Sequence, residues 1–152
     1  GPDVVSILPD SSSVLLGQDV VLTIEVDDTR YSHSNGAEAA QNVSEAEFYV
    51  DSPPWDGGLA VAMSALDGSF DSSSELADAT LQTSGLSIGR HTIFARARDA
   101  DGNWGAITAA FLTVQAPPMV PGLTDWARLA LVFVIISGGL VWISRRTPSL
   151  RR

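Results

Sequence analysis

The sequence contains no cysteine and no lysine. Without cysteine, a disulfide scaffold and any thiolate metal site are excluded, so a folded domain must be stabilised by its own hydrophobic core. Motifs for hydrolysis are also missing: there is no His-Glu-x-x-His, no Gly-x-Ser-x-Gly and no phosphate-binding glycine loop. The only histidines, His33 and His91, lie far apart in the sequence. We therefore expect this chain not to be an enzyme.

Charge is distributed very unevenly along the chain. Residues 1–116 hold 17 acidic residues against four arginines, which gives a net charge of −13. Residues 117–152 hold one acidic residue against five arginines, which gives +4. The acidic part repels nucleic acid and offers no basic patch for a phosphate backbone, so nucleic-acid binding is excluded as a function class.

Apolar and polar residues alternate with a period of two in several short segments before residue 116. The pattern is clearest over 19–26, 45–51, 77–82 and 92–98, with shorter apolar runs at 4–8 and 107–114. A further short apolar run, 60–63, predicts a short edge strand. Turn residues separate these segments, and no helical period occurs before residue 125. About seven strands in this length predict an all-β fold, an immunoglobulin-like antiparallel β-sandwich over residues 1–115.

A different segment follows the predicted sandwich. Residues 116–125 form a proline-rich linker, which favours an extended, semi-rigid spacer. The apolar run 129–143 would be about 22 Å long as a helix, and 126–144 would be about 28 Å, close to the thickness of a bilayer core. Trp126 and Trp142 lie near opposite ends of this run. The sequence therefore predicts a single C-terminal transmembrane helix over 126–144.

Basic residues near its ends predict the orientation of this helix. Only Arg128 marks the N-terminal end, whereas a basic tail, residues 145–152, follows the helix and contains Arg145, Arg146, Arg151 and Arg152. The positive-inside rule places this tail in the cytoplasm and the β domain in the periplasm or outside the cell. We expect membrane lipid to be a partner of residues 126–144, and the whole chain to be the C-terminal part of a longer precursor.

The tail also resembles a known type of signal. It begins with Val120, Pro121, Gly122, Leu123, Thr124, Asp125 and Trp126, followed by one hydrophobic helix and an arginine cluster. This arrangement resembles bacterial C-terminal sorting signals of the PEP-CTERM kind, in the variant that begins Ile-Pro-Thr-Leu; Gly122 stands where that variant has threonine. The resemblance implies a Gram-negative envelope protein and an envelope sorting peptidase as partner, with release after processing as the alternative to permanent anchoring.

Two clusters of oxygen donors suit calcium by residue type. One comprises Asp99, Asp101 and Asn103, at alternate positions, and the other includes Asp27 and Asp28 at the start of a long polar connection over 27–44. The first cluster fails as an EF-hand, because the twelfth position is Ala110. A hairpin turn explains the same residues, so calcium is the only cofactor that the sequence suggests and a turn is the alternative.

Three further side chains are candidates for a binding or a structural role. Trp55, after Pro53 and Pro54, and Trp104 could stack on a sugar ring as exposed aromatic residues, or Trp55 could pack over the sandwich edge. His91 opens a predicted strand just after Gly89-Arg90, where a sandwich domain places a corner-fixing residue. We expect a structural role for His91.

The β region carries a second resemblance. Its segments are Val26-Asp27-Asp28-Thr29-Arg30-Tyr31, the run Ala46 to Trp55, Gly89-Arg90-His91-Thr92, Arg96-Ala97-Arg98-Asp99 and Gly102-Asn103-Trp104-Gly105. They resemble the Ig-like domain that follows the catalytic domain of secreted bacterial zinc carboxypeptidases and other exported proteases. The resemblance implies a non-catalytic accessory module whose partner is an upstream catalytic domain of the same precursor. A cell-surface adhesion or carbohydrate-binding module, stabilised by calcium, is the alternative function.

Overall fold

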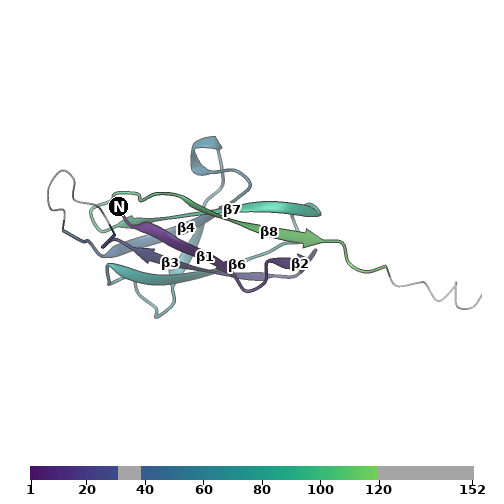
Figure 1. The fold of residues 1–152 in the computed structure, drawn as a ribbon, viewed down its shortest axis with the longest axis horizontal. Coiled ribbons are helices and arrows are strands. Elements are labelled where there is room, and N and C mark those ends of the chain that lie inside the picture. The colour runs from purple at the N-terminus through teal and green to yellow at the C-terminus, as the bar shows by residue number, and fades with distance from the viewer. Residues whose placement is uncertain (31–38, 120–152) are drawn as a thin grey trace, which may run out of the picture. The chain divides into compact units, whose positions relative to one another are not determined.

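A computed structural model describes residues 1–30 and 39–119 (Figure 1). It contains eight strands and one short 3₁₀ helix in the described residues: β1 (Asp3–Pro9), β2 (Ser13–Leu15), β3 (Val20–Asp27), β4 (Val43–Val50), η1 (Pro54–Asp56), β5 (Val61–Ala65), β6 (Ser74–Leu81), β7 (Gly89–Asp99) and β8 (Thr108–Gln115). The predicted sorting motif, transmembrane helix and basic tail lie outside these residues. Among the residues that are described, no helix is long and apolar enough to cross a membrane.

The strands form two antiparallel layers. The first sheet contains β1, β3 and β6, and the second contains β4, β7 and β8, with β2 added parallel to β8. Strand β5 belongs to both, because it pairs with β4 through 61–63 and with β6 through 64–65. When the short strand β2 is left aside, the first, second and fifth strands in chain order (β1, β3 and β6) face the third, sixth and seventh (β4, β7 and β8). This is the arrangement of an immunoglobulin-like sandwich. The predicted fold of the β region is confirmed.

The core lies between the two sheets and follows from the alternation in the sequence. On β3, Val20, Leu22, Ile24 and Val26 are all at most 1% exposed, while the residues between them face outward. The opposite sheet contributes a matching set of inward side chains from β4, β7 and β8: Ala46, Phe48, Ile93, Ala95, Ala97, Leu112 and Val114. Each strand thus has one buried and one solvated face, which is the pattern that the period of two predicts.

Two strands differ from the sequence-based prediction. Strand β2 was not predicted, because Ser13–Leu15 is too short to show a period and follows a run of serines. Strand β5 was predicted at an edge of the sandwich, and this is wrong: it lies between β4 and β6 and links the two sheets. Its position depends on pairing with residues distant in sequence, which alternation does not encode.

The ends of the β-sandwich lie at opposite poles. Near the start of β1, the Val4 carbonyl accepts a hydrogen bond from the Thr108 hydroxyl at the start of β8 (2.6 Å). At the other pole Gln115, the last residue of β8, pairs with Leu15. Seven residue steps along β8 correspond to about 23 Å. Within the compact unit Gly1–Pro117, the chain therefore enters at one pole and leaves at the other (Figure 1).

Candidate binding loop and histidine corner

A tight loop, residues 51–60, follows β4, and Asp51 fixes its first residue. The Asp51 backbone has φ 61°, in the left-handed region that non-glycine residues rarely adopt. Three interactions hold it there: its N–H donates to the Thr92 carbonyl (2.8 Å), its Oδ1 accepts the Thr92 N–H (3.0 Å), and its Oδ2 lies 2.7 Å from Nδ1 of His91. Strained backbone persists only where its surroundings determine it in this way.

His91 is the buried partner in this arrangement. Its side chain is 5% exposed, and its Nε2 lies 2.8 Å from the Ser87 carbonyl, which can only accept a hydrogen bond. Nε2 must therefore carry the hydrogen that it donates to Ser87. Nδ1 can also donate to the Asp51 carboxylate only when the ring is doubly protonated. The bonds to Ser87 and then to Asp51 raise the pKa of His91 above its usual value. The expected structural role is confirmed: the ring ties the 83–88 corner to the end of β4.

The contact with His91 also shifts the pKa of the Asp51 carboxyl. Burial by itself would raise its pKa, but the hydrogen bonds from His91 and from the Thr92 N–H, together with the charge on the imidazole, outweigh burial and lower the pKa. The side chain is 51% exposed, so water screens part of this attraction. The two shifts agree in direction and indicate an imidazolium–carboxylate pair.

The remainder of the loop is closely constrained by its backbone. Pro53 precedes η1, and its carbonyl accepts hydrogen bonds from the N–H groups of Asp56 and Gly58, both at 3.0 Å. Gly57 has φ 76°, and a Cβ added to Gly58 would lie 1.9 Å from the Ser52 carbonyl oxygen. Only glycine fits this second position without movement of the backbone. The loop is therefore built around its proline and glycine residues.

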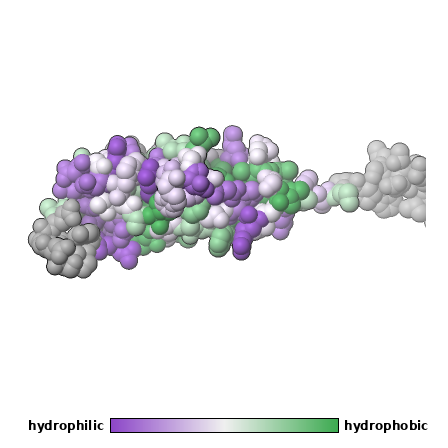
Figure 2. Space-filling view, turned by 90° about the horizontal axis from the view of Figure 1, so that it is seen from above, coloured by the Kyte–Doolittle hydropathy of each residue, from purple (hydrophilic) through white to green (hydrophobic). Residues whose placement is uncertain are grey.

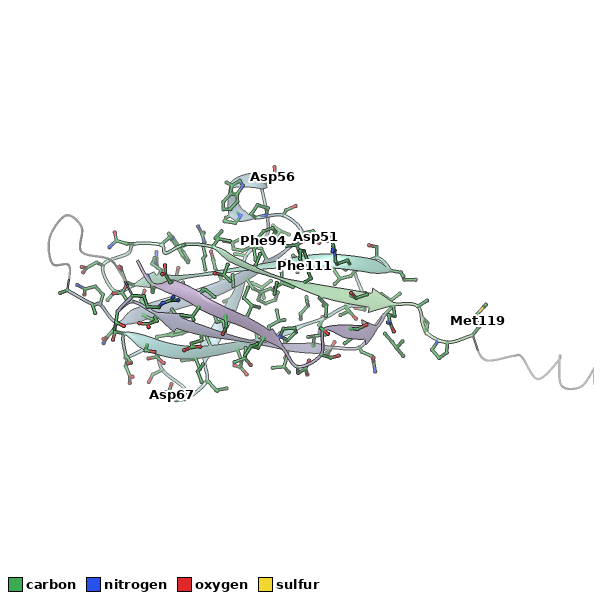
Figure 3. All side chains as sticks on the ribbon, in the orientation of Figure 1. Asp51, Asp56, Asp67, Phe94, Phe111 and Met119 are labelled. Carbon is green, nitrogen blue, oxygen red and sulfur yellow. The ribbon has the colours of Figure 1, made fainter. Side chains whose placement is uncertain are left out.

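This loop displays apolar side chains to solvent. Trp55 is 74% exposed and Leu59 is 86% exposed. Leu59 also lines a cavity of about 350 Å³, together with Val50, Ser52, Gly57, Gly58 and Val61. Figure 3 shows Asp56 at the outer tip of η1, above the labelled aromatic residues Phe94 and Phe111. The predicted packing of Trp55 over the sandwich edge is wrong, since most of its surface remains accessible.

Trp104 is placed differently. It lies half-buried after the 99–103 turn, with the Arg96 guanidinium 3.9 Å and the Arg98 guanidinium 5.3 Å from its ring centroid. Arg96 also forms an ion pair with Glu47 at 2.7 Å. The structure thus places Trp55 and Trp104 in separate settings and covers Trp104 with cations. The alternation of Arg96 and Arg98 along β7 was the only sequence signal for this cluster, which we did not predict.

Tyr49 extends this cluster on the outward face of the second sheet. It is 2% exposed, and its hydroxyl donates to the Glu47 carboxylate. Burial, and then the bond to Glu47, raises the pKa of Tyr49 to about 12. The view from above in Figure 2 shows hydrophilic and hydrophobic residues intermixed over this side of the described domain.

Four of the five predicted calcium ligands, Asp99, Asn103, Asp27 and Asp28, have protein hydrogen-bond partners. The Asp99 carboxylate is 3% exposed and accepts the Asn103 N–H (2.8 Å) and its side-chain amide, while Asp101 is exposed. Gly102, with φ 89°, completes the turn, which confirms the turn reading of this segment. Asp27 accepts the Thr29 N–H (2.7 Å), and Asp28 accepts the Gln41 N–H.

Calcium binding at these positions stays a prediction. Within residues 1–30 and 39–119, no group of three or more His, Cys, Asp or Glu is arranged to hold a metal ion. The oxygen donors are placed for turn formation by the hydrogen bonds just described. A melting temperature measured with and without millimolar calcium would test the ion directly, because a ligand that binds the folded state raises it.

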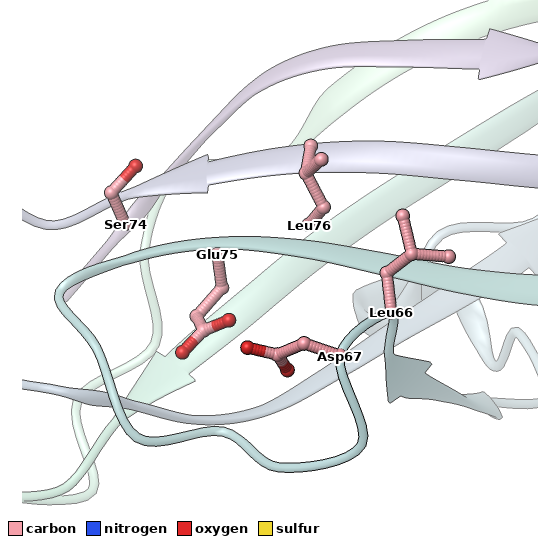
Figure 4. A pocket seen from close by; sticks show the side chains of 5 residues that line it. All are labelled: Leu66, Asp67, Ser74, Glu75 and Leu76. Atoms are coloured by element: carbon pink, nitrogen blue, oxygen red, sulfur yellow. The ribbon is translucent and has the colours of Figure 1, made fainter.

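A second cavity, of about 310 Å³, lies beside β6. It is lined by Leu66, Asp67, Ser74, Glu75 and Leu76 (Figure 4). Glu75 is 6% exposed, and its Oε1 accepts the N–H groups of Asp71 (3.0 Å) and Ser72 (2.7 Å). These bonds close the 66–73 connection, so Glu75 has a structural role.

Comparison with known proteins gives little further information. Neither a protein-family model nor a curated protein matches the sequence. Among solved structures, the fibronectin(III)-like modules of Clostridium thermocellum CbhA are similar at 14% identity and a TM-score of 0.42, over 74% of this chain and 98% of that one. The sporulation control protein Spo0M from Bacillus subtilis is similar at 16% identity and a TM-score of 0.48, over 77% of this chain and half of that one.

Proposed function

We propose that this chain is the non-catalytic C-terminal accessory module of an exported bacterial hydrolase, a zinc carboxypeptidase-like protease. Its Ig-like sandwich acts as a spacer, and the segment after it acts as a sorting and membrane-anchoring tail. The observation that supports this proposal best is the position of the two ends at opposite poles of the sandwich. A domain built in this way separates whatever precedes it from whatever follows it by about its own length.

The bonding between the sheets suits a spacer that must keep its length. On one side β5 pairs with strands of both sheets, and on the other the Thr108 hydroxyl bonds to Val4 while β2 lies along β8. Bonds on both sides oppose sliding of one sheet over the other.

Charge supports the same role. The sandwich region has a net charge of −13, and membrane surfaces rich in anionic lipid repel such a domain. The tail carries +4, with four of its five arginines after the apolar run. This difference would hold the sandwich away from lipid while the basic end remains at the cytoplasmic surface.

The absence of cysteine provides a direct test of the topology. Single cysteines placed at Ser84, which is exposed in the sandwich, and at Ser149 in the tail would be the only thiols in the chain. In intact spheroplasts, a membrane-impermeant maleimide is expected to label Ser84→Cys and to label Ser149→Cys only after lysis. Labelling of Ser149→Cys in intact spheroplasts would contradict the proposed orientation.

The accessory role has its own test. Residues 1–117 form a compact unit with a complete core, so they can be studied alone. We expect this fragment to remain soluble in the periplasm, while the full chain sediments with membranes. Peptide hydrolysis by the purified fragment would overturn the non-catalytic assignment.

A further inference from the structure

We propose that the Trp55 loop, residues 51–60, is a preformed binding site for a neutral polysaccharide, with the indole of Trp55 stacked on a sugar ring. This function goes beyond the spacer role, because it assigns a ligand to the side of the sandwich. Three observations carry it: the exposure of Trp55, the rigidity of the loop, and the chemistry of its surroundings.

The exposure of Trp55 is unusual for its residue type. Tryptophan is highly buried on average, and here 74% of its surface is accessible, with Leu59 at 86% close along the chain. Leaving such side chains in water forgoes about 25 cal/mol for each Å² that packing would have buried. An apolar side chain held out by a structured loop is typical of a recognition site.

Rigidity makes the loop suitable for binding. Asp51 is held by His91 and Thr92, and the Pro53 carbonyl closes η1 onto Gly58. The loop therefore loses little conformational freedom when a ligand binds, and a preformed site avoids that entropic cost. The left-handed backbone of Asp51 is itself a strain of the sort that clusters at ligand sites.

The chemistry of the loop disfavours charged ligands. It contains Asp51 and Asp56 but no basic residue, which disfavours phosphate, sulfate, uronate and nucleic acid. Its local negative charge is also small, since His91 pairs with Asp51. A basic ligand would thus find only Asp56 unneutralised within the loop. A neutral ligand fits this balance best.

A sugar ring matches the remaining features. Its C–H face is apolar and weakly positive, and the face of an indole is negative, so the two stack favourably. Its hydroxyl rim requires hydrogen-bonding groups, which Ser52 and Asp56 supply within the same loop. Other residues of the loop, Ser52, Gly57, Gly58 and Leu59, line a cavity of about 350 Å³, which is within the size range of small-molecule sites.

The footprint favours a sugar over a protein partner. A stable protein interface buries about 800 Å² on each side and requires a broad complementary surface. On the adjacent outward face of the second sheet, Arg96 and Arg98 are paired with Glu47 and Glu45 at 2.7 and 2.8 Å. On β8 of the same sheet Phe111 is also 57% exposed, but the Arg90 guanidinium lies 4.5 Å from the centroid of its ring. Charged side chains therefore interrupt the apolar surface beyond the loop, and a chain of sugar units needs only a narrow contact.

Affinity electrophoresis of fragment 1–117 tests the proposal. Native gels would contain a β-1,3-glucan, hydroxyethyl cellulose, a galactomannan or soluble starch, with polygalacturonate and heparin as charged comparisons. We expect at least one neutral polymer to retard the fragment. Trp55→Ala should weaken that binding at least tenfold, and Trp55→Phe should retain part of it.

A matched variant controls for general effects of losing an exposed apolar side chain. Leu8 is 62% exposed on β1 of the first sheet. The variant Leu8→Ala should therefore bind the polymer like the unmodified fragment. Thermal melts should show Trp55→Ala to be folded. The proposal is overturned if no neutral polymer retards the fragment, if Trp55→Ala is retarded equally, or if the charged polymers bind more strongly. None of these outcomes bears on the topology experiment, so the two proposals fail independently.

Discussion

Replacement of His91 by phenylalanine should destabilise the sandwich by about 2–4 kcal/mol. Phenylalanine preserves a ring but removes both N–H donors. The carbonyl of the exposed residue Ser87 would lose a part-buried hydrogen bond of 2.8 Å from the charged imidazole, and a hydrogen bond to a charged group contributes about 1.5–3 kcal/mol. The Asp51 carboxylate would also lose a charged partner at 2.7 Å, but it is 51% exposed, so water compensates for part of that loss.

The stabilisation by His91 should depend on pH in a defined direction. Because the folded-state pKa of His91 is raised, its contribution is complete below the unfolded imidazole pKa, about 6.5, and is lost as pH rises through the folded value. Because the pKa of Asp51 is lowered, its contribution is complete above the unfolded carboxyl pKa, about 3.9, and is lost as pH falls through the folded value. The pair therefore contributes fully between about pH 4 and 6.5.

Urea unfolding of fragment 1–117 at pH 5.5 and pH 8.5 would measure both effects. The unmodified fragment should be more stable at pH 5.5, and the difference should shrink in His91→Phe. His33 is the only other histidine in the chain, so His33→Gln is the matched control and should retain the difference. If His91→Phe kept the same pH dependence, the imidazolium–carboxylate pair would not be its source.

Three further predictions test the core and the outward face. Leu22→Ala, at a fully buried position, should cost about 2–5 kcal/mol in urea unfolding, whereas Leu8→Ala should change stability by less than about 0.5 kcal/mol; equal costs would contradict the assigned core. Arg96→Ala should expose Trp104, shifting its fluorescence to longer wavelength, and should cost about 1–2 kcal/mol; an unchanged spectrum would refute the stacking. Alkaline titration followed by absorbance, in a variant lacking the other tyrosine, should show Tyr49 ionising near 12, and a midpoint near 10 would show that it is not buried.

The sequence was most informative where one face of a strand meets the core. Val20, Leu22, Ile24 and Val26 alternate so regularly that strand, orientation and inward face follow together, and β3 has these properties. The same reasoning could not place β5, whose neighbours come from residues 46–48 and 77–78. Pairing between distant segments depends on the closed sandwich rather than on the segment itself.

The exposure of Trp55 and Trp104 also could not be predicted from the local sequence. Pro53 and Pro54 predicted that a strand ends there, and β4 does end at Val50. Whether Trp55 then packs or projects depends on Gly58, which approaches the Ser52 carbonyl, and on Asp51, which is held by β7. Trp104 is covered by arginines that belong to another part of the chain. Exposure is thus a property of tertiary contacts that a local pattern does not contain.

A last prediction links the histidine corner to the Trp55 loop. Asparagine tolerates left-handed backbone, so Asp51→Asn should keep the φ of 61° and the bond from the Thr92 N–H while removing the charge that faces His91. Asp51 is the only charged side chain that the described residues place against the ring. If the pair positions the loop, retention of the unmodified fragment by a neutral polysaccharide should weaken as pH rises through the raised folded-state pKa of His91, because the ring then loses the proton that faces Asp51.

The Asp51→Asn variant separates this positioning role from direct contact with the sugar. It should bind more weakly at pH 5.5 and show a flatter pH profile, while Trp55→Ala should bind weakly at every pH. A general loss of stability would not flatten the profile, because both measurements are made well below the melting temperature of each variant. If Asp51→Asn kept the full pH profile, the loop would be held by its proline and glycine residues alone, and His91 would serve only the corner at Ser87.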